Sequence, residues 1–204
     1  MLKILLATGN PGKKKEILEC FASLKGQIQW CSLKDFPPIP EPEENGSDFE
    51  TNAAIKAEYF GKAHNILTLS EDSGLSIEAF PDKFGVRTKR EFTAKDDMDW
   101  MTQFLDLMDG EDNREAHFYS AFALFDPKTG KSQTTLGGIG GEIAEFPMAP
   151  LEPGIPVSSV FMPEGYSEAY SAMTKKQKST ISHRGRSAAL MIKILQDTIA
   201  TQAV

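Results

Sequence analysis

The stretch Lys3-Ile-Leu-Leu-Ala-Thr-Gly-Asn-Pro-Gly-Lys13 decides the fold class. Its first five residues form a largely apolar run that predicts a strand, and the Gly-Asn-Pro-Gly segment predicts a turn. Apolar residues then recur at spacings of four and three, at Ile17, Phe21 and Leu24, which predicts a helix. A strand, a glycine-containing turn and a helix in this order indicate an α/β protein.

The rest of the chain continues this alternation of strands and helices. Strands are predicted at residues 28–32, 67–70, 75–80, 116–125 and 134–143, and helices at about 48–64, 96–108 and 182–200. The last helix is expected to bury a stripe formed by Ala189, Ile192, Leu195 and Ile199. Residues 35–46 are proline-rich and acidic, and residues 71–74 are predicted to form an acidic turn.

Prolines recur at every third position at Pro147, Pro150, Pro153 and Pro156, which predicts a stiff, extended loop of the polyproline type. No internal repeat or linker-like segment divides the sequence. We therefore expect one α/β domain with a mixed sheet over residues 1–204.

The composition limits the class of protein. The 204 residues include 22 Lys and Arg against 29 Asp and Glu, a net charge of −7, and 40% are hydrophobic, which excludes a disordered chain. No apolar run approaches the roughly 20 residues of a membrane span, and no basic face favours a nucleic acid polymer as partner. Cys20 and Cys31 suit a reduced compartment, so a cytoplasmic location is expected, and three scattered histidines disfavour zinc. A protein of this charge that binds an anion must concentrate its cations locally.

The first candidate site lies between the first strand and the first helix. A helix N-terminus presents unpaired N–H groups and a partial positive charge, so anions bind there. Thr8 and Asn10 can donate hydrogen bonds, Gly9 and Gly12 allow close approach, and Lys13 adds a full charge. The spacing is not that of a Walker A loop. The alternative is a capped strand–helix turn without a ligand.

The second candidate site is acidic. Glu43 and Glu44 lie in the proline-rich loop, and Glu71 and Asp72 follow a predicted strand. Carboxylates at strand ends hold Mg²⁺ together with a substrate's phosphates, and one of them can accept a proton from attacking water. The alternative is a solvated acidic turn.

The third candidate site is a local excess of positive charge. Ser182-His183-Arg184-Gly185 opens the last predicted helix, and Lys175, Lys176 and Lys178 precede it. Arg offers a planar fork of donors and His a donor or acceptor, which suits phosphate or the polar edge of a base. The alternative, a solvated helix start, opposes the helix dipole at a cost of a few tenths to about 1 kcal/mol.

Five segments in a fixed order extend these candidates over nearly the whole chain. They are residues 6–13, 43–46 with 49–57, 71–75, 161–166 and 181–186. Together they resemble one family, the non-canonical purine nucleoside triphosphate pyrophosphatases, also called inosine triphosphatases. The resemblance implies an elongated α/β fold, with a mixed sheet, flanking helices and two lobes around a central cleft, and a homodimer. It also implies Mg²⁺-dependent hydrolysis of ITP, dITP and XTP to the monophosphate and pyrophosphate, which cleanses the nucleotide pool.

The resemblance also implies roles for residues at matching positions. The phosphate tail would be held by Thr8, Asn10 and Lys13. Glu44 and Asp72, with Glu71 nearby, would organise Mg²⁺, and Asp72 would be the base for the attacking water.

Further roles follow from the same resemblance. Lys56 would neutralise charge that develops on the phosphates. The nucleotide would be faced by Ser73, Lys178, His183 and Arg184, the last two at the base.

Two segments depart from the family pattern. The family normally carries a Phe-Gly-Tyr-Asp-Pro motif before residues 161–166, whose aromatic stacks on the purine and whose Asp reads the base. Here residues 155–159 are Ile-Pro-Val-Ser-Ser. Stacking contributes about 1–3 kcal/mol per base, so its loss would weaken binding about 5- to 150-fold. Residues 84–90 read Phe-Gly-Val-Arg-Thr-Lys-Arg, and only Gly85, Val86 and Arg90 match the usual Pro-Gly-Val-Tyr-Ser-Ala-Arg.

Three functions therefore stay open at the level of sequence. The first is a pyrophosphatase for ITP, dITP and XTP. The second is an enzyme of the same family with changed base specificity. The third is a non-catalytic nucleotide-binding module on the same scaffold.

Overall fold

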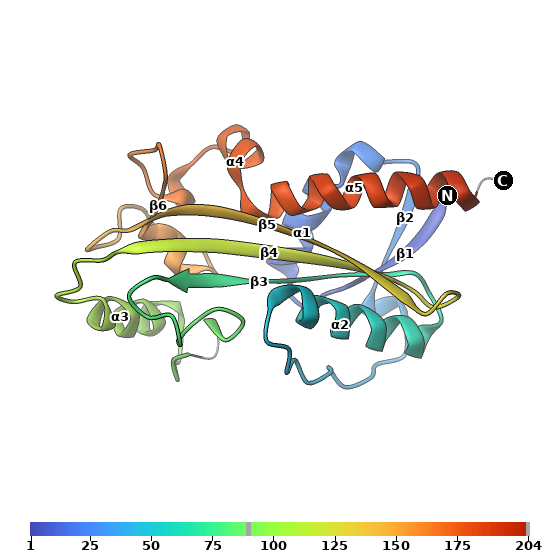
Figure 1. The fold of residues 1–204 in the computed structure, drawn as a ribbon, viewed down its shortest axis with the longest axis horizontal. Coiled ribbons are helices and arrows are strands. Elements are labelled where there is room, and N and C mark those ends of the chain that lie inside the picture. Colours follow the sequence, from blue (N-terminus) through green and yellow to red (C-terminus); the bar gives the residue numbers. More distant parts are fainter. Residues whose placement is uncertain (89–90, 203–204) are drawn as a thin grey trace. The chain divides into compact units, whose positions relative to one another are not determined.

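The computed structural model of the protein describes residues 1–88 and 91–202. Within this part of the chain, six strands form one mixed sheet in the order β2-β1-β3-β4-β5-β6 (Figure 1). The strands are β1 (Leu2–Ala7), β2 (Ile28–Ser32), β3 (Thr68–Ile77), β4 (Glu115–Asp126), β5 (Lys131–Ile143) and β6 (Phe161–Pro163). β1 runs parallel to both β2 and β3, whereas β5 and β6 are antiparallel. The predicted α/β class with a mixed sheet is confirmed.

Five α-helices flank the sheet in the described residues: α1 (Pro11–Cys20), α2 (Phe49–His64), α3 (Asp97–Leu107), α4 (Lys175–Ile181) and α5 (His183–Gln202). Asp48 and Asp96 cap α2 and α3, because their side chains accept hydrogen bonds from backbone N–H groups of the first turn. The predicted starts of these two helices are confirmed. Of the helices described, none is both long and apolar enough to cross a membrane.

The internal contacts of the chain divide it into two compact units. The first unit comprises Met1–Ser73, Ser120–Gly137 and Arg184–Val204, and the second comprises Gly74–Tyr119 and Gly138–His183. The resemblance implied two lobes, and two units are found. The assignment of residues 1–204 to a single domain stays a prediction.

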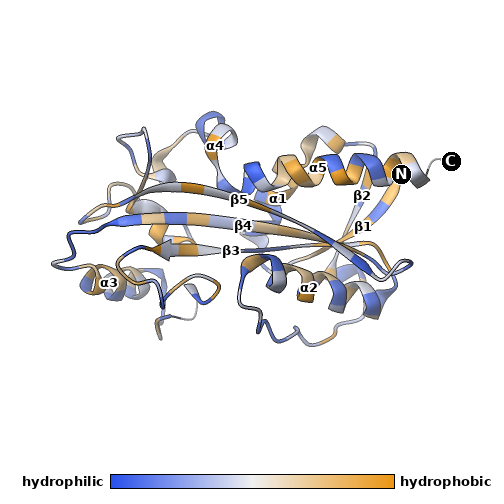
Figure 2. Cartoon of the chain, viewed as in Figure 1, coloured by the Kyte–Doolittle hydropathy of each residue, from blue (hydrophilic) through white to orange (hydrophobic). Residues whose placement is uncertain are grey.

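The core of the first unit follows from the alternation of side chains along β1. Ile4 and Leu6 point to one face and join a cluster that includes Ile17 of α1 and Met191 of α5. Leu5 points to the other face, into a cluster with Phe60 of α2, so the helices cover both faces. Bands of hydrophobic and hydrophilic residues alternate along α2 and α5 (Figure 2), as burial of one side of each helix requires.

Aromatic side chains dominate the core of the second unit. Trp100 and Phe104 of α3 are buried and stack with ring centroids 5.1 Å apart. Phe118 of β4 meets Phe161 of β6 edge to face at 4.5 Å. Such pairs add about 0.5–1.5 kcal/mol each to the burial of their area.

The predicted turn at residues 71–74 is wrong, because β3 continues through it without interruption. Polar residues suggested exposure, yet Ser70, Glu71 and Asp72 are all buried. Ser70 Oγ donates to the carbonyl of Ala53, and Glu71 is surrounded by cations. The polar run therefore marks a site inside a strand instead of a bend in the chain.

The C-terminal third also differs from expectation in detail. The buried residues of α5 include Ala188, Met191 and Leu195, whereas Ala189, placed in the predicted stripe, is exposed. Neither α4 nor β6 was predicted, since both are too short to show a period. The segment with a proline at every third position, residues 147–156, was predicted to be extended, but it is not extended throughout. Gly154 has φ +80°, and Pro156–Ser159 form a 3₁₀ turn.

Candidate active site

The turn between β1 and α1 is built around Asn10. Its side-chain oxygen accepts hydrogen bonds from the backbone N–H groups of Gly12 (2.9 Å) and Lys13 (3.2 Å), and Pro11 occupies the first turn. The hydroxyl of Thr8 accepts from the backbone N–H of Asn10 at 3.2 Å. The sequence alternative of a capped turn therefore describes the local geometry correctly. Asn10 keeps its amide N–H₂ as a donor, because its oxygen caps the helix.

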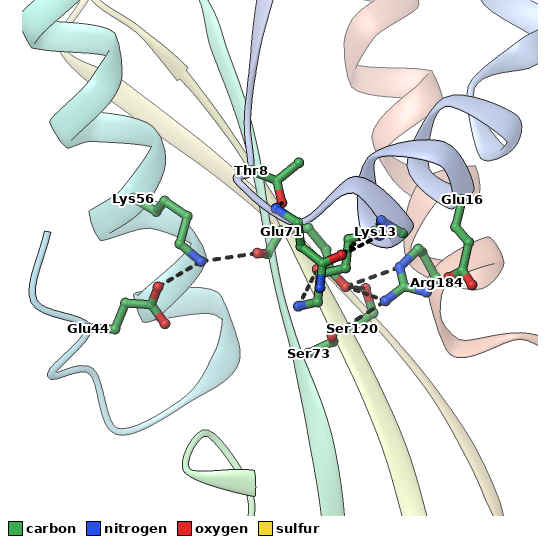
Figure 3. A network of polar contacts seen from close by, with 11 residues as sticks. Thr8, Lys13, Glu16, Glu44, Lys56, Glu71, Ser73, Ser120 and Arg184 are labelled. Atoms are coloured by element: carbon green, nitrogen blue, oxygen red, sulfur yellow. Dashed lines mark hydrogen bonds and ion pairs between the residues drawn. The ribbon is translucent and has the colours of Figure 1, made fainter. Parts of the chain in front are cut away.

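Glu71 is the centre of the charged cluster in the first unit (Figure 3). Its side chain is fully buried; Oε2 lies 2.9 Å from Lys13 Nζ, and Oε1 lies 3.1 Å from Arg184 Nη2. Ser120 Oγ donates to Oε1 at 2.9 Å. Burial raises the pKa of Glu71, but the Lys13 ammonium and the Arg184 guanidinium outweigh it, so its pKa lies well below the usual range. Glu71 is thus an ionised carboxylate that holds two cations.

Lys56 of α2 approaches the same strand from another direction (Figure 3). Its Nζ lies 2.9 Å from Glu44 Oε1 and donates to the backbone carbonyl of Glu71 at 3.4 Å. Glu44 comes from the proline-rich loop that precedes α2, so that loop contributes a carboxylate directly to the cluster. The contacts bring together side chains that the sequence spaces over many residues.

Asp72 differs from its neighbour Glu71. It is 7% exposed, and its Oδ2 is buried without a hydrogen-bond partner in the described part of the chain. Burial raises the pKa of Asp72 to about 6, with Lys56 and Lys13 lowering it. A buried carboxylate oxygen without a partner is costly, so it fits a position that a ligand completes.

The acidic residues fit a divalent cation only in part. Among the residues described, no group of three or more His, Cys, Asp or Glu side chains is placed to hold a metal ion. Mg²⁺ is commonly held by one or two carboxylates together with substrate phosphates, so a smaller set is sufficient. Asp72 has the open oxygen, and Glu44 is near enough to raise its pKa. Both oxygens of Glu71 face cations instead.

Two of the predicted nucleotide-binding residues belong to the second unit. The His183 ring stacks on Phe118 with centroids 5.3 Å apart, and the ring of Tyr170 lies 6.1 Å from it. Lys178 Nζ lies 5.0 Å from the centre of the Tyr170 ring and 3.4 Å from Glu152 Oε2. His183 and Lys178 therefore share an aromatic neighbour, Tyr170, as well as a unit.

The segment that replaces the base-stacking motif offers no open hydroxyl. Ser158 Oγ donates to the carbonyl of Ile155 at 2.7 Å, and Ser159 Oγ donates to that of Pro156 at 2.9 Å. Both serines are buried. In the other departing segment, Phe84 is buried, while the predicted match at Arg90 lies outside the described residues.

The structure gathers most predicted site residues in the first unit, and the remaining two in the second. The first group is Thr8, Asn10, Lys13, Glu44, Lys56, Glu71, Asp72, Ser73 and Arg184. Sequence reasoning missed Glu16 and Ser120, which contact Arg184 and Glu71. Ser120 had a signal, since it is the one Ser or Thr within the largely apolar residues 116–125, and Glu16 lies one helical turn after Lys13.

An α/β sheet with a helix N-terminus, two lysines and a buried open carboxylate defines a protein equipped for the chemistry of phosphate esters and anhydrides. The chain belongs to the Ham1 family, whose model matches residues 4–194.

Relatives and solved structures agree with this membership. The chain is 33% identical over 202 residues to the dITP/XTP pyrophosphatase of Deinococcus deserti, covering 99% of this chain and 93% of the relative. It is 35% identical over 191 residues to that of Bacillus cereus, covering 91% of each. The structure of a HAM1 protein from Coxiella burnetii has a TM-score of 0.83 at 28% identity, covering 97% of this chain and 100% of that one.

Proposed function

We propose that the protein hydrolyses the non-canonical purine nucleoside triphosphates ITP, dITP and XTP to the monophosphate and pyrophosphate. The relatives named dITP/XTP pyrophosphatase support the substrate class. The observation that carries the proposal is the open, buried Oδ2 of Asp72 beside two lysines of the same unit. That arrangement suits a base for water next to cations for phosphate.

The phosphate tail is proposed to lie at the start of α1. Thr8 and the Asn10 amide are donors there, and the Lys13 ammonium is held in place by Glu71. Lys56 is held by Glu44 in the same way. Cations that are already oriented stabilise the charge that develops on the phosphates without reorganising, which is the main source of catalysis in phosphoryl transfer.

Asp72 is the proposed general base. A carboxyl group with a pKa of about 6 is mostly ionised at pH 7 and still basic enough to accept a proton. The Asp72 carboxylate would take one proton from the attacking water as the water oxygen bonds to phosphorus, the anhydride bond between the α- and β-phosphates breaks, and pyrophosphate separates from the monophosphate. Glu71 cannot replace it, because its carboxylate is held by Lys13 and Arg184 and its pKa is low.

Mg²⁺ is proposed as the cofactor, held by Asp72 and Glu44, with Glu71 adjacent. When bound, the ion would neutralise charge on the phosphates and orient them. The residues fit such an ion because Asp72 has an oxygen without a partner and two carboxylates suffice when phosphates complete the shell.

His183, Lys178, Arg184 and Ser73 are the proposed nucleotide contacts, with His183 and Arg184 at the base. The closed hydroxyls of Ser158 and Ser159 favour a second candidate, an enzyme of the same family with changed base specificity. A homodimer and a cytoplasmic location complete the proposal. Size-exclusion chromatography with light scattering tests the dimer, and a fluorescent fusion tests the location.

The deciding experiment is a substrate panel. The protein is incubated with Mg²⁺ and each of ITP, dITP, XTP, dUTP and the common triphosphates, and pyrophosphate release is measured. We expect release that Asp72→Asn abolishes, that chelation of Mg²⁺ stops, and that Asp112→Asn, an exposed control, leaves unchanged. Values of kcat/KM across the panel distinguish a preference for ITP, dITP and XTP from a preference for another base. Binding of ITP by calorimetry without turnover of any triphosphate would instead identify a non-catalytic module.

A further inference from the structure

Arg184 is held between two carboxylates in the first unit (Figure 3). On one side, Nη2 and Nε lie 3.1 Å and 3.2 Å from Glu71 Oε1. On the other side, Nη1 pairs with Oε2 of Glu16, a residue of α1. The Arg184 side chain is only 6% exposed, so these contacts fix the guanidinium within the protein.

The same contacts form a chain of alternating charge from Glu16 through Arg184 and Glu71 to Lys13. Glu71 is completely buried and must balance both of its cations, whereas Glu16 is 37% exposed and contacts the far side of Arg184. Glu16 and Lys13 lie three positions apart on α1, so the chain of contacts begins and ends on the same helix.

This arrangement determines how strongly Glu71 attracts Lys13. While Arg184 shares the charge of Glu71, the Lys13 ammonium is oriented but incompletely neutralised. If Arg184 turned away, Glu71 would have Lys13 as its remaining ion-pair partner among the contacts described and would draw it in more closely. Glu16 fixes the outer side of Arg184 and thereby prevents that change.

We propose that Glu16 and Arg184 are positioning residues that set the location and charge of Lys13 Nζ through Glu71. The inference rests on the proposed function, because it concerns the lysine that would bind the phosphate tail. It adds a second role to the proposed contact of Arg184 with the base, since the guanidinium also contacts Glu71, Glu16 and Ser73. Glu16 is a new functional residue on this view.

The kinetic test compares Glu16→Ala and Glu16→Gln with Glu58→Gln. Glu58 is a matched control, because it is an acid of α2 in the same unit, paired with Lys62 at the surface. We expect Glu16→Ala to lower kcat about 10-fold or more with KM changed less than about 3-fold, since small misplacements of charged groups mainly affect the transition state. Glu16→Gln keeps an acceptor for Arg184, so it restores part of kcat. We expect the loss of kcat in Glu16→Ala to be equal for ITP, dITP and XTP.

A second measurement observes Lys13 without relying on turnover. The NMR signal of the Lys13 ammonium, assigned with Lys13→Arg, reports its ion pair with Glu71 directly. We expect it to shift in Glu16→Ala, to shift less in Glu16→Gln and to stay unchanged in Glu58→Gln. If Glu16→Ala does not fold, the shift of the Lys13 signal in Glu16→Gln is compared with that in Glu58→Gln, and this comparison decides whether Glu16 positions Lys13.

The outcomes distinguish the two proposals. A parent protein that releases no pyrophosphate from any triphosphate overturns the proposed function, and the Lys13 signal still decides whether Glu16 positions Lys13. An unchanged Lys13 signal in a folded Glu16 variant overturns the positioning proposal. So does a kcat within twofold of the Glu58→Gln control, or a loss that differs between bases.

Discussion

Replacing Glu71 by Gln removes the negative charge at the centre of the first unit while keeping the shape of the side chain. The carboxylate contacts Lys13 and Arg184 and accepts a hydrogen bond from Ser120. Gln retains one acceptor oxygen, but its amide N–H₂ group must then face one of the two cations. We therefore expect Glu71→Gln to lower the free energy of unfolding.

The exposures of the partners determine the size of this effect. Removing one member of a buried ion pair costs about 3–5 kcal/mol, because a charge is left without compensation. Lys13 is 25% exposed and can turn toward water, and Arg184 keeps Glu16. Both features favour the lower limit, about 3 kcal/mol, which corresponds to a fall in Tm of about 6–12 °C for a protein of this size.

The assay must follow the first unit separately. The chain has two tryptophans, Trp30 in β2 and Trp100 in α3, which belong to different units. A Trp100→Phe background leaves Trp30 as the single reporter of the first unit. Urea unfolding followed by Trp30 fluorescence then gives the free energy of unfolding for Glu71→Gln and for its parent at pH 7.

Two comparisons decide the result. Glu58→Gln breaks an exposed pair with Lys62 and is expected to cost less than about 1 kcal/mol. Adding Arg184→Met to Glu71→Gln removes a cation that has lost its main partner, so it should cost less than the same change in the parent, by about 0.5–3 kcal/mol. The reasoning is refuted if the free energy of unfolding of Glu71→Gln lies within about 1 kcal/mol of that of the parent. It is also refuted if the losses caused by Glu71→Gln and Arg184→Met simply add in the double variant.

Three further predictions concern other parts of the chain. Asp48→Ala removes the cap of α2 and should lower the free energy of unfolding by about 0.5–2 kcal/mol. The hydrogen bonds that Asp48 accepts lower its pKa, so this stabilisation is present above about pH 4 and disappears as the pH falls further. Urea unfolding of Asp48→Ala and Asp48→Asn at several pH values checks this. Gly61→Ala places a Cβ 2.5 Å from Phe125 Cδ1 and should cost about 1–3 kcal/mol, and Phe125→Leu should relieve part of that cost in thermal unfolding. Glu152→Gln frees Lys178 from an ion pair worth about 0.2–1 kcal/mol, so the KM for ITP should fall about 1.5- to 5-fold; an equal fall in the Lys178→Met background would contradict this.

Most of the elements could be predicted from the sequence because their patterns are local. The apolar run of residues 3–7 and the start of the helix at about residue 48 each depend on a few neighbouring residues, and both elements were predicted correctly. The α5 stripe was displaced by one position at Ala189, since the identical residue Ala188 precedes it and is the buried one.

The errors at the site have a different physical cause. Residues 71–74 were predicted to be a turn because buried strands are usually apolar, yet here cations from distant segments compensate the buried acid. Those partners, Lys13 and Arg184, lie far from Glu71 in sequence, so no local pattern could indicate the pairing. For the same reason, sequence reasoning overlooked Glu16, which pairs with Arg184.

The net charge of −7 conceals how the cations of the site are arranged. Each cation predicted to meet the substrate has a carboxylate partner: Lys13 with Glu71, Lys56 with Glu44, Lys178 with Glu152, and Arg184 with Glu16 and Glu71. A triphosphate must compete with those acids, which lowers the affinity that the positive charges alone would give. In return, the lysines are already ordered, so binding loses less side-chain entropy. An acidic protein can therefore bind a polyanion with few cations, provided that its acids hold those cations in position until the phosphates replace them.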